Sequence, residues 1–240
     1  MKINKRYKYL IIINCLLLQV GLSQPSETSR ANDSQLWGDM TLTESFAEKW
    51  SIGGDFGLRS SLNNNNWWQF YIRPNINYEL SPIYNFSFGL GTFSTFSSQA
   101  FNTWEFRIYQ DANFNWPEIG FFNFQHRVRI EQRFFEYTEG IPNSFSVRGR
   151  YLLGVRTDNF SLGGQQSWHG FMSLEPFIPL GKESGELRAN NFRWDTAIGH
   201  QIDQTLRIEL HYILQSSDLF SLNSLSVVDH LFRIRVFKSL

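Results

Sequence analysis

The stretch QHRVRIEQRFF, residues 125–135, alternates charged and apolar side chains. The two sets are Arg127, Arg129, Glu131 and Arg133 on one parity, and Val128, Ile130 and Phe134 on the other. On a helix, residues two apart point about 200° apart, so neither set would share a face. In a strand, alternate residues lie on the same face. The sequence therefore predicts a strand with one charged face and one apolar face.

The same alternation recurs along most of the chain. The segments expected to form strands are residues 36–44, 50–60, 67–80, 83–96, 102–116, 121–135, 144–156, 160–178, 187–200, 205–215 and 226–237. Most are longer than the roughly five or six residues usual in soluble strands. They match the roughly 9–11 residues that a tilted strand needs to cross a bilayer. We therefore predict an all-β fold, a transmembrane antiparallel up-and-down β-barrel of 10–12 strands, with an even number expected.

The connections support a barrel over a soluble β-sandwich with an aromatic core. Short turns such as 47–49 and 81–82 alternate with longer polar links such as 60–66 and 136–143. This alternation is typical of outer-membrane barrels. Aromatic residues flank both kinds of connection and predict two interfacial girdles. They are Trp50, Tyr78, Tyr84, Trp116 and Phe121 beside the short turns, and Trp67, Trp68, Trp104, Phe135 and Tyr137 beside the longer links.

The first 23 residues have the pattern of a secretory signal peptide. Four basic residues precede the apolar run 9–22, and small residues near Ser23 offer a cleavage site. The alternative, a membrane anchor, is disfavoured because the apolar run is short for a full span. Cleavage would remove Cys15, the one cysteine, and leave 18 basic against 22 acidic residues, a net charge of −4. This charge argues against nucleic acid as a partner.

In a barrel, the charged face would line the lumen. The residues predicted to line it are Arg73, Glu79, Glu105, Arg107, Arg127, Arg129, Glu131, Arg133, Arg148, Arg150, Glu175, Arg193, Arg207, Glu209, Arg233 and Arg235, and the same face includes Asp55, Arg59, Asp111, Arg156 and Asp195. These are thirteen bases and eight acids, which predicts a positive interior. Three interpretations stay open: an interlocked ion-pair network that closes the barrel, a narrow conduit that prefers anions, or a role in ligand binding or assembly.

Catalysis is not expected. Outer-membrane lipid hydrolases and deacylases place a His and a Ser on a strand near the rim, as a close His-x-Ser pair. None of the five histidines here has a serine two residues later, and Ser167-Trp168-His169 reverses the order. No residues have metal-ligand spacing and no phosphate-binding loop is present, so no metal or cofactor is predicted. A lipid hydrolase at the rim is kept as the alternative function.

Three segments resemble successive strands of a known family. WEFRIYQ (104–110), RVRIEQRF (127–134) and VRGRYLLG (147–154) are similar to a bacterial outer-membrane β-barrel family classed only as a domain of unknown function, family 2490. The early Trp37 and the late segment RIELHYILQ (207–215) also fit. The resemblance covers roughly residues 36–237 and implies a barrel in the outer membrane, with no catalytic residues. The end of the chain departs from the usual barrel ending, because Phe237 is followed by Lys238-Ser239-Leu240.

Taken together, the sequence predicts a signal peptide (1–23) cleaved near Ser23, a polar lead-in (24–35) and an outer-membrane β-barrel (36–240) in a Gram-negative bacterium. The expected partners are outer-membrane lipid, the barrel assembly machinery and small anionic solutes. The transported solute and the oligomeric state are not encoded in any motif.

Overall fold

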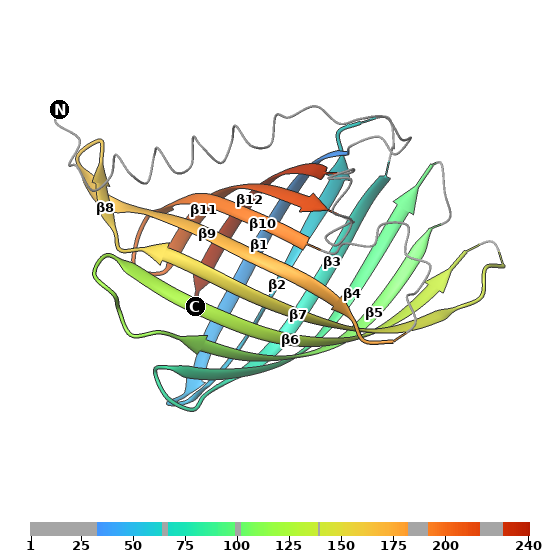
Figure 1. The fold of residues 1–240 in the computed structure, drawn as a ribbon, viewed down its shortest axis with the longest axis horizontal. Helices are drawn as coiled ribbons and strands as arrows, with labels where there is room; N and C mark the ends of the chain where they lie inside the picture. The colour runs from blue at the N-terminus through green and yellow to red at the C-terminus, as the bar shows by residue number, and fades with distance from the viewer. Residues whose placement is uncertain (1–32, 64–66, 99–101, 139, 182–191, 217–227) are drawn as a thin grey trace, which may run out of the picture.

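A computed structural model describes residues 33–63, 67–98, 102–138, 140–181, 192–216 and 228–240 (Figure 1). The strands are β1 (Ser34–Ala47), β2 (Trp50–Ser61), β3 (Trp67–Glu79), β4 (Tyr84–Ser97), β5 (Thr103–Asn115), β6 (Phe122–Tyr137), β7 (Ser144–Thr157), β8 (Phe160–Leu162), β9 (Gln165–Pro179), β10 (Phe192–Gln201), β11 (Leu206–Ser216) and β12 (Val228–Ser239). No helix in these ranges is long and apolar enough to cross a membrane. The expected signal peptide and most of the expected lead-in lie outside the described residues.

The sheet closes on itself as a barrel of eleven long strands. Neighbouring long strands pair antiparallel, except that β1 pairs with β12 in parallel, from Ser34 opposite His230 to Thr43 opposite Ser239. The predicted all-β barrel of 10–12 strands is confirmed, but the expectation of an even number was wrong. With an odd number of up-and-down strands, the first and last run in the same direction, so the closing pair must be parallel.

The segment 160–178, expected as one strand, divides into β8 and β9. Gly163 and Gly164 form the turn between them, with φ angles of 63° and 86°. Glycine adopts positive φ readily because it has no Cβ. The resulting short hairpin extends from one end of the barrel (Figure 1) and adds no strand to its wall.

The barrel has two different ends. At the short-turn end, the strands are joined by residues 48–49, 80–83, 116–121, 158–164 and 202–205; at the long-loop end, by residues 62–66, 98–102, 138–143, 180–191 and 217–227. The strand β1 begins at the long-loop end, whereas β12 finishes at the short-turn end. The first and last strands therefore leave the barrel at opposite ends, unlike those of a barrel with an even number of strands.

The outer face of the barrel is apolar and exposed. Leu58, Ile72, Val128, Leu210 and Ile234 are among many large apolar side chains that face outwards. The predicted girdle residues Trp50, Trp68, Tyr84, Trp104 and Trp116 are also exposed near the strand ends. Phe135 departs from that prediction, because it is buried on the charged face of β6.

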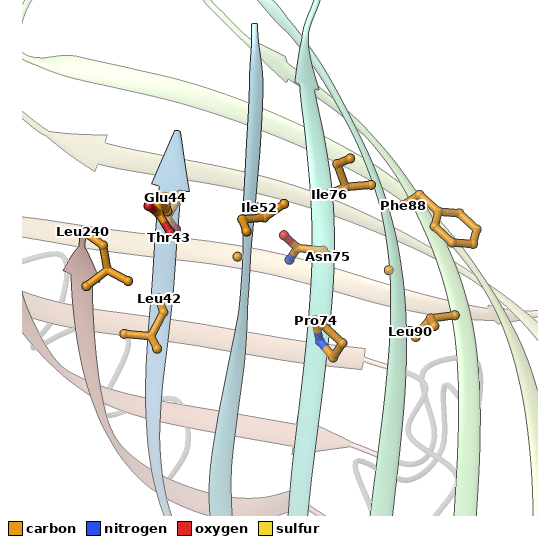
Figure 2. Close-up of a pocket in the computed structure, with 12 residues that line it drawn as sticks. Leu42, Thr43, Glu44, Ile52, Pro74, Asn75, Ile76, Phe88, Leu90 and Leu240 are labelled. Carbon is orange, nitrogen blue, oxygen red and sulfur yellow. The ribbon is translucent and has the colours of Figure 1, made fainter. Parts of the chain in front are cut away.

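A groove of about 520 Å³ lies on this outer face, across β1 to β4 (Figure 2). Its lining includes Leu42, Ile52, Ile76 and Phe88, together with Leu240 beyond β12. These side chains are apolar, whereas the opposite, buried face of the strands is charged. The two faces of the wall therefore differ as sharply as the alternation in the sequence predicts.

Candidate functional site

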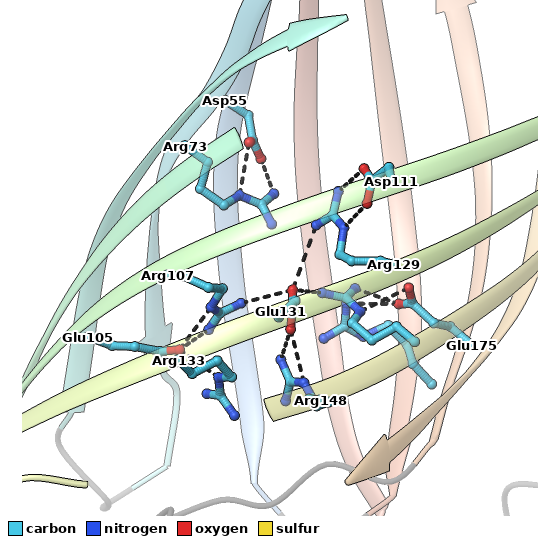
Figure 3. Close-up of polar contacts among 12 residues, drawn as sticks. Asp55, Arg73, Glu105, Arg107, Asp111, Arg129, Glu131, Arg133, Arg148 and Glu175 are labelled. Atoms are coloured by element: carbon cyan, nitrogen blue, oxygen red, sulfur yellow. Dashed lines mark hydrogen bonds and ion pairs between the residues drawn. The ribbon is translucent and has the colours of Figure 1, made fainter. Parts of the chain in front are cut away.

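The buried face of the strands holds most of the charged residues of the protein. Carboxylates and guanidinium groups of most long strands meet inside the barrel in a set of ion pairs, and Figure 3 shows those of β2, β3, β5, β6, β7 and β9. Strand periodicity directs them there, because each alternates with an apolar residue of the outer face. Buried charges are tolerated when they are paired and hydrogen-bonded, so the contacts decide what this interior can do.

Glu131 of β6 is fully buried, with 0% of its surface exposed. Arg148 donates to its Oε2 from Nη2 at 2.6 Å, and Arg150 donates to its Oε1 from Nη1 at 2.9 Å. The Nη1 atoms of Arg107 and Arg129 lie 3.4 Å and 3.8 Å from the same Oε1. We call Glu131 and these four arginines the Glu131 cluster. One carboxylate thus holds four guanidinium groups together, from β5, β6 and β7.

Three more carboxylates extend this network. The pairs are Glu105 with Arg107 and Arg133, Asp111 with Arg129, and Glu175 with Arg127, Arg150 and Arg193. Arg127 and Glu175 belong to β6 and β9, which are separated by β7, and their side chains still meet at 2.6 Å. This contact bridges the inner face of the intervening strand β7. The network therefore occupies space that an open channel would need.

Aromatic rings on the inner face support the arginines. The guanidinium carbon of Arg59 lies 4.1 Å from the Trp37 ring centre and 4.4 Å from that of Tyr71. Arg129 lies 4.3 Å from the ring of Tyr109, a geometry in which cation and ring attract each other. That ring occupies the space beside Gly89, where an added Cβ would come within 2.1 Å of it. Gly89 is therefore required for the packing of Tyr109.

Asp39 of β1 was not among the predicted residues, although it anchors part of the interior. It accepts hydrogen bonds from Arg233 Nε at 2.5 Å and from Arg235 Nε at 2.9 Å. Both arginines lie on β12, so these bonds join the parallel pair that closes the barrel. The signal was the alternation of Gln35, Trp37 and Asp39 in β1, which places them on one face.

A second cluster surrounds Glu209 of β11. Its Oε1 lies 3.0 Å from His169 Nε2, 3.1 Å from Arg156 Nη1 and 3.1 Å from Arg207 Nε. Its Oε2 lies 3.0 Å from Nε2 of His211. We call Glu209, these two histidines and these two arginines the Glu209 cluster. The sequence analysis predicted Glu209 and Arg207 as interior residues. It did not connect them with His169, because His169 and Glu209 are forty positions apart in the sequence.

Two further residues shape the Glu209 cluster. Asp195 Oδ1 lies 2.8 Å from Nδ1 of His211, so both ring nitrogens of this histidine face carboxylates. Gly199 lies beside His169, and an added Cβ there would meet Nε2 of the ring at 2.2 Å. The glycine thus leaves room for the imidazole that contacts Glu209.

Of the predicted lumen-lining residues, Glu79 differs from the rest. It is exposed at the end of β3, and no ion pair is found for it within the described part of the chain. The others each contact at least one oppositely charged side chain: Arg73, Glu105, Arg107, Arg127, Arg129, Glu131, Arg133, Arg148, Arg150, Glu175, Arg193, Arg207, Glu209, Arg233 and Arg235. Whether they line a lumen that conducts solutes stays a prediction.

The serine and histidine considered for catalysis are not partners of each other. His169 binds Glu209 in the interior, while Ser167 Oγ lies 3.1 Å from Nε2 of His200 on β10. This contact joins two strands and could not be read from local spacing. Within the described ranges, no three His, Cys, Asp or Glu side chains are placed to hold a metal ion.

A protein-family model matches most of the chain. No curated protein matches the chain. The family described as "Protein of unknown function (DUF2490)" matches residues 34–225, which include the strands β1 to β11 and both clusters. The protein therefore belongs to this family.

Proposed function

We propose that this protein is an outer-membrane β-barrel closed by its own interior ion pairs, a structural barrel and not an open channel. The observation that carries the proposal is the Glu131 cluster, in which one fully buried carboxylate holds four arginines from three strands. Separating such groups leaves buried charges without partners, which is costly. The network is therefore expected to keep the interior shut.

The outer face supports the membrane part of the proposal. Barrel strands of 10–16 residues are long enough to cross a bilayer at a tilt. The exposed apolar side chains would be unfavourable in water and are suited to lipid tails, and the groove on β1 to β4 belongs to the same surface. We expect secretion by way of a signal peptide and insertion by the barrel assembly machinery.

Contacts that cross the interior support closure. Arg193 of β10 lies 5.3 Å from the Trp37 ring of β1, although two strands separate these elements in the sheet. The same guanidinium group lies 5.3 Å from the Phe177 ring of β9. With the bridge between Arg127 and Glu175, side chains from strands that are not neighbours meet on the inner face of the barrel.

Conductance tests the proposal. The full chain, expressed in a Gram-negative host and recovered from its outer membrane, would be inserted into planar bilayers under a salt gradient. Inserted protein, verified by heat-modifiable migration on gels, is expected to give no current steps. Stable steps with a reversal potential that favours anions, lost in Arg129→Glu, would overturn closure and establish the narrow anion-preferring pore. Absence from the outer membrane fraction would contradict the localisation.

A rim-sited lipid hydrolase is the second candidate, favoured by the contact between Ser167 and His200. A histidine at hydrogen-bonding distance can activate a serine hydroxyl as a nucleophile. Release of fatty acid from phospholipid vesicles, abolished in both Ser167→Ala and His200→Ala and kept in Ser161→Ala, would support this function. Equal rates in all variants, or none in the unaltered protein, would exclude it.

A further inference from the structure

Three arginines at the short-turn end of the interior stay partly accessible. The side chains of Arg156, Arg207 and Arg235 are 30%, 27% and 22% exposed, whereas that of Arg150 in the Glu131 cluster is 7% exposed. Arg156 lies near the end of β7, Arg207 near the start of β11 and Arg235 near the end of β12. All three positions are close to the short turns, so solutes could reach them from that end.

The guanidinium groups of two of these residues converge although their strands are not neighbours. Arg156 and Arg207 both lie 3.1 Å from Glu209 Oε1, while β9 and β10 separate β7 from β11 in the sheet. Arg235 lies in the neighbouring strand β12, where its residue pairs directly with Glu209. Two of the three positive groups therefore contact one carboxylate, and the third belongs to the residue that pairs with it on the neighbouring strand.

These arginines also keep donors that the protein does not use. Arg156 and Arg207 contact Glu209, but neither makes an aligned hydrogen bond within the described residues, and the buried Nε of Arg207 lies 3.1 Å from Glu209 Oε1 without the alignment of a hydrogen bond. In the Glu131 cluster, by contrast, Arg148 donates two bonds to Glu131. Each guanidinium carries five N–H donors. Most donors of Arg156 and Arg207 are thus available to another acceptor.

Aromatic rings hold the site in place. The ring of Phe237 lies 4.0 Å from the guanidinium carbon of Arg207 and 4.6 Å from that of Arg235. Phe171 lies 5.6 Å from Arg156. Stacking of this kind limits the freedom of long side chains before any ligand arrives, which reduces the entropy lost on binding.

The negative charge of Glu209 faces both Arg156 and Arg207. The second carboxylate of this region, Asp195, contacts His211, and Arg235 shares Asp39 with Arg233. A planar guanidinium fork matches an anion with two or more oxygens better than a single-atom ion. We propose that Arg156, Arg207 and Arg235 form a binding site for a small oxyanion of the phosphate type, reached from the short-turn end of the barrel.

The site does not depend on whether the barrel conducts. Binding from one end needs no passage past the Glu131 cluster, so the conductance result neither supports nor contradicts it. Free phosphate and the phosphate group of a lipid share the required chemistry. We therefore expect inorganic phosphate to bind in a non-ionic maltoside detergent, and a water-soluble short-chain phosphatidate added there separates the two sources.

Isothermal titration of the folded full chain with inorganic phosphate is the test. The unaltered protein is expected to bind one phosphate, and Arg207→Gln to weaken binding at least tenfold. Glu209→Gln, which removes the competing negative charge and keeps the side-chain shape, is expected to strengthen binding several-fold. Arg59→Gln is the matched control, because Arg59 is an interior arginine on β2 that contacts aromatic rings and no carboxylate in the described structure.

The outcomes are distinct. Saturable phosphate binding that changes in Arg207→Gln and Glu209→Gln but not in Arg59→Gln supports a site for free oxyanions. Binding of the short-chain phosphatidate alone, with the same response to the variants, supports the oxyanion site and assigns it to a lipid headgroup. No binding by properly folded protein, or equal binding in Arg207→Gln, would overturn the proposal.

Discussion

The Glu131 cluster and the Glu209 cluster both neutralise a buried carboxylate, but they do so with different basic residues. In both, a buried carboxylate on the inner face of the barrel contacts four basic side chains. Around Glu131, all four are arginines, and three of them donate hydrogen bonds to it. Around Glu209, two are histidines, and the two arginines are partly exposed. In the first cluster both carboxylate oxygens accept hydrogen bonds from arginines, and the side chains are held firmly. In the second cluster the arginines keep N–H donors that no acceptor in the described structure uses.

This difference follows from position. The Glu131 cluster lies in the middle part of β5 to β7, where charged residues stand opposite one another on neighbouring strands, as Arg129 does with Asp111 and Arg150. The Glu209 cluster lies closer to the short-turn end, where side chains reach solvent. A buried ion pair needs hydrogen bonds to offset desolvation, whereas an accessible one can use water. The interior therefore combines a part that maintains the barrel with a part able to exchange ligands.

Glu131→Ala is expected to have the largest effect. It leaves Arg107, Arg129, Arg148 and Arg150 around an empty space with no shared counter-charge. Removing one partner of a buried pair typically costs about 3–5 kcal/mol. The free energy of unfolding, measured by urea titration of protein refolded into vesicles with tryptophan fluorescence, is expected to fall by that amount or more.

Glu79→Ala supplies the matched control for this variant. Glu79 has the same parity on the inner face but is exposed at the end of β3, so the same deletion is expected to stay within about 0.5 kcal/mol. Equal losses of stability in Glu131→Ala and Glu79→Ala would show that the cluster does not hold the barrel together.

Glu209→Ala comes next, with an expected loss of about 2–3 kcal/mol. The loss is smaller because the partly exposed Arg156 and Arg207 can be hydrated where they stand. The same urea titration measures it. Added salt is expected to reduce the loss of stability in Glu209→Ala more than that in Glu131→Ala, because salt screens accessible charges more than buried ones. A loss as large as that of Glu131→Ala, insensitive to salt, would remove the distinction between the two clusters.

The sequence predicted much of this interior but not the parallel pairing of β1 with β12 that closes the barrel. Alternation alone identified the strands and all five charged residues of the Glu131 cluster, because they share one parity on successive strands. Phe135 has the same parity as Arg133 and therefore belongs to the charged face. The assignment of Phe135 to a girdle was wrong because it did not apply this alternation. For Glu79 the alternation predicted too much: the residue has the parity of the inner face, but it is exposed because it lies at the end of β3.

Contacts between distant strands were not predictable in the same way. The pairing of β1 with β12, and with it the bonds of Asp39 to two arginines of β12, depends on how the sheet closes. The contact between His169 and Glu209 depends on the register of β9, β10 and β11. The split of β8 from β9 was signalled locally by Gly163-Gly164, a dipeptide typical of turns.

Gly199→Ala tests whether His169 contributes to the Glu209 cluster. The added methyl group would overlap the imidazole, at 2.2 Å from Nε2, and displace it from Glu209. Overpacking of this kind is expected to cost roughly 1–2 kcal/mol. Gly38→Ala on β1 is the control, because an added Cβ there meets nothing within 4 Å and should leave the unfolding free energy unchanged. Equal stabilities of the two variants would mean that His169 can move without loss.

Asp203 extends the comparison to a carboxylate outside the barrel wall, and it carries the smallest expected effect. Its Oδ1 accepts bonds from Thr205 N at 2.7 Å, Thr205 Oγ1 at 2.8 Å and Leu206 N at 2.9 Å, in the turn between β10 and β11. The backbone hydrogen bond from Thr205 is the largest influence that holds the pKa of Asp203 below its ordinary value. A lowered pKa in the folded state stabilises the fold above the pKa of the unfolded chain, and this contribution is lost as the pH falls through the folded pKa.

The variant Asp203→Ala is therefore expected to reduce stability slightly at neutral pH and not at all in acid. Urea titrations of both proteins at neutral and acidic pH measure the difference. Because neutral donors satisfy this carboxylate in full contact with water, its removal leaves no buried charge behind, unlike the removal of Glu131 or Glu209. A loss that persists unchanged in acid would mean that Asp203 supports the turn through its shape and not its charge.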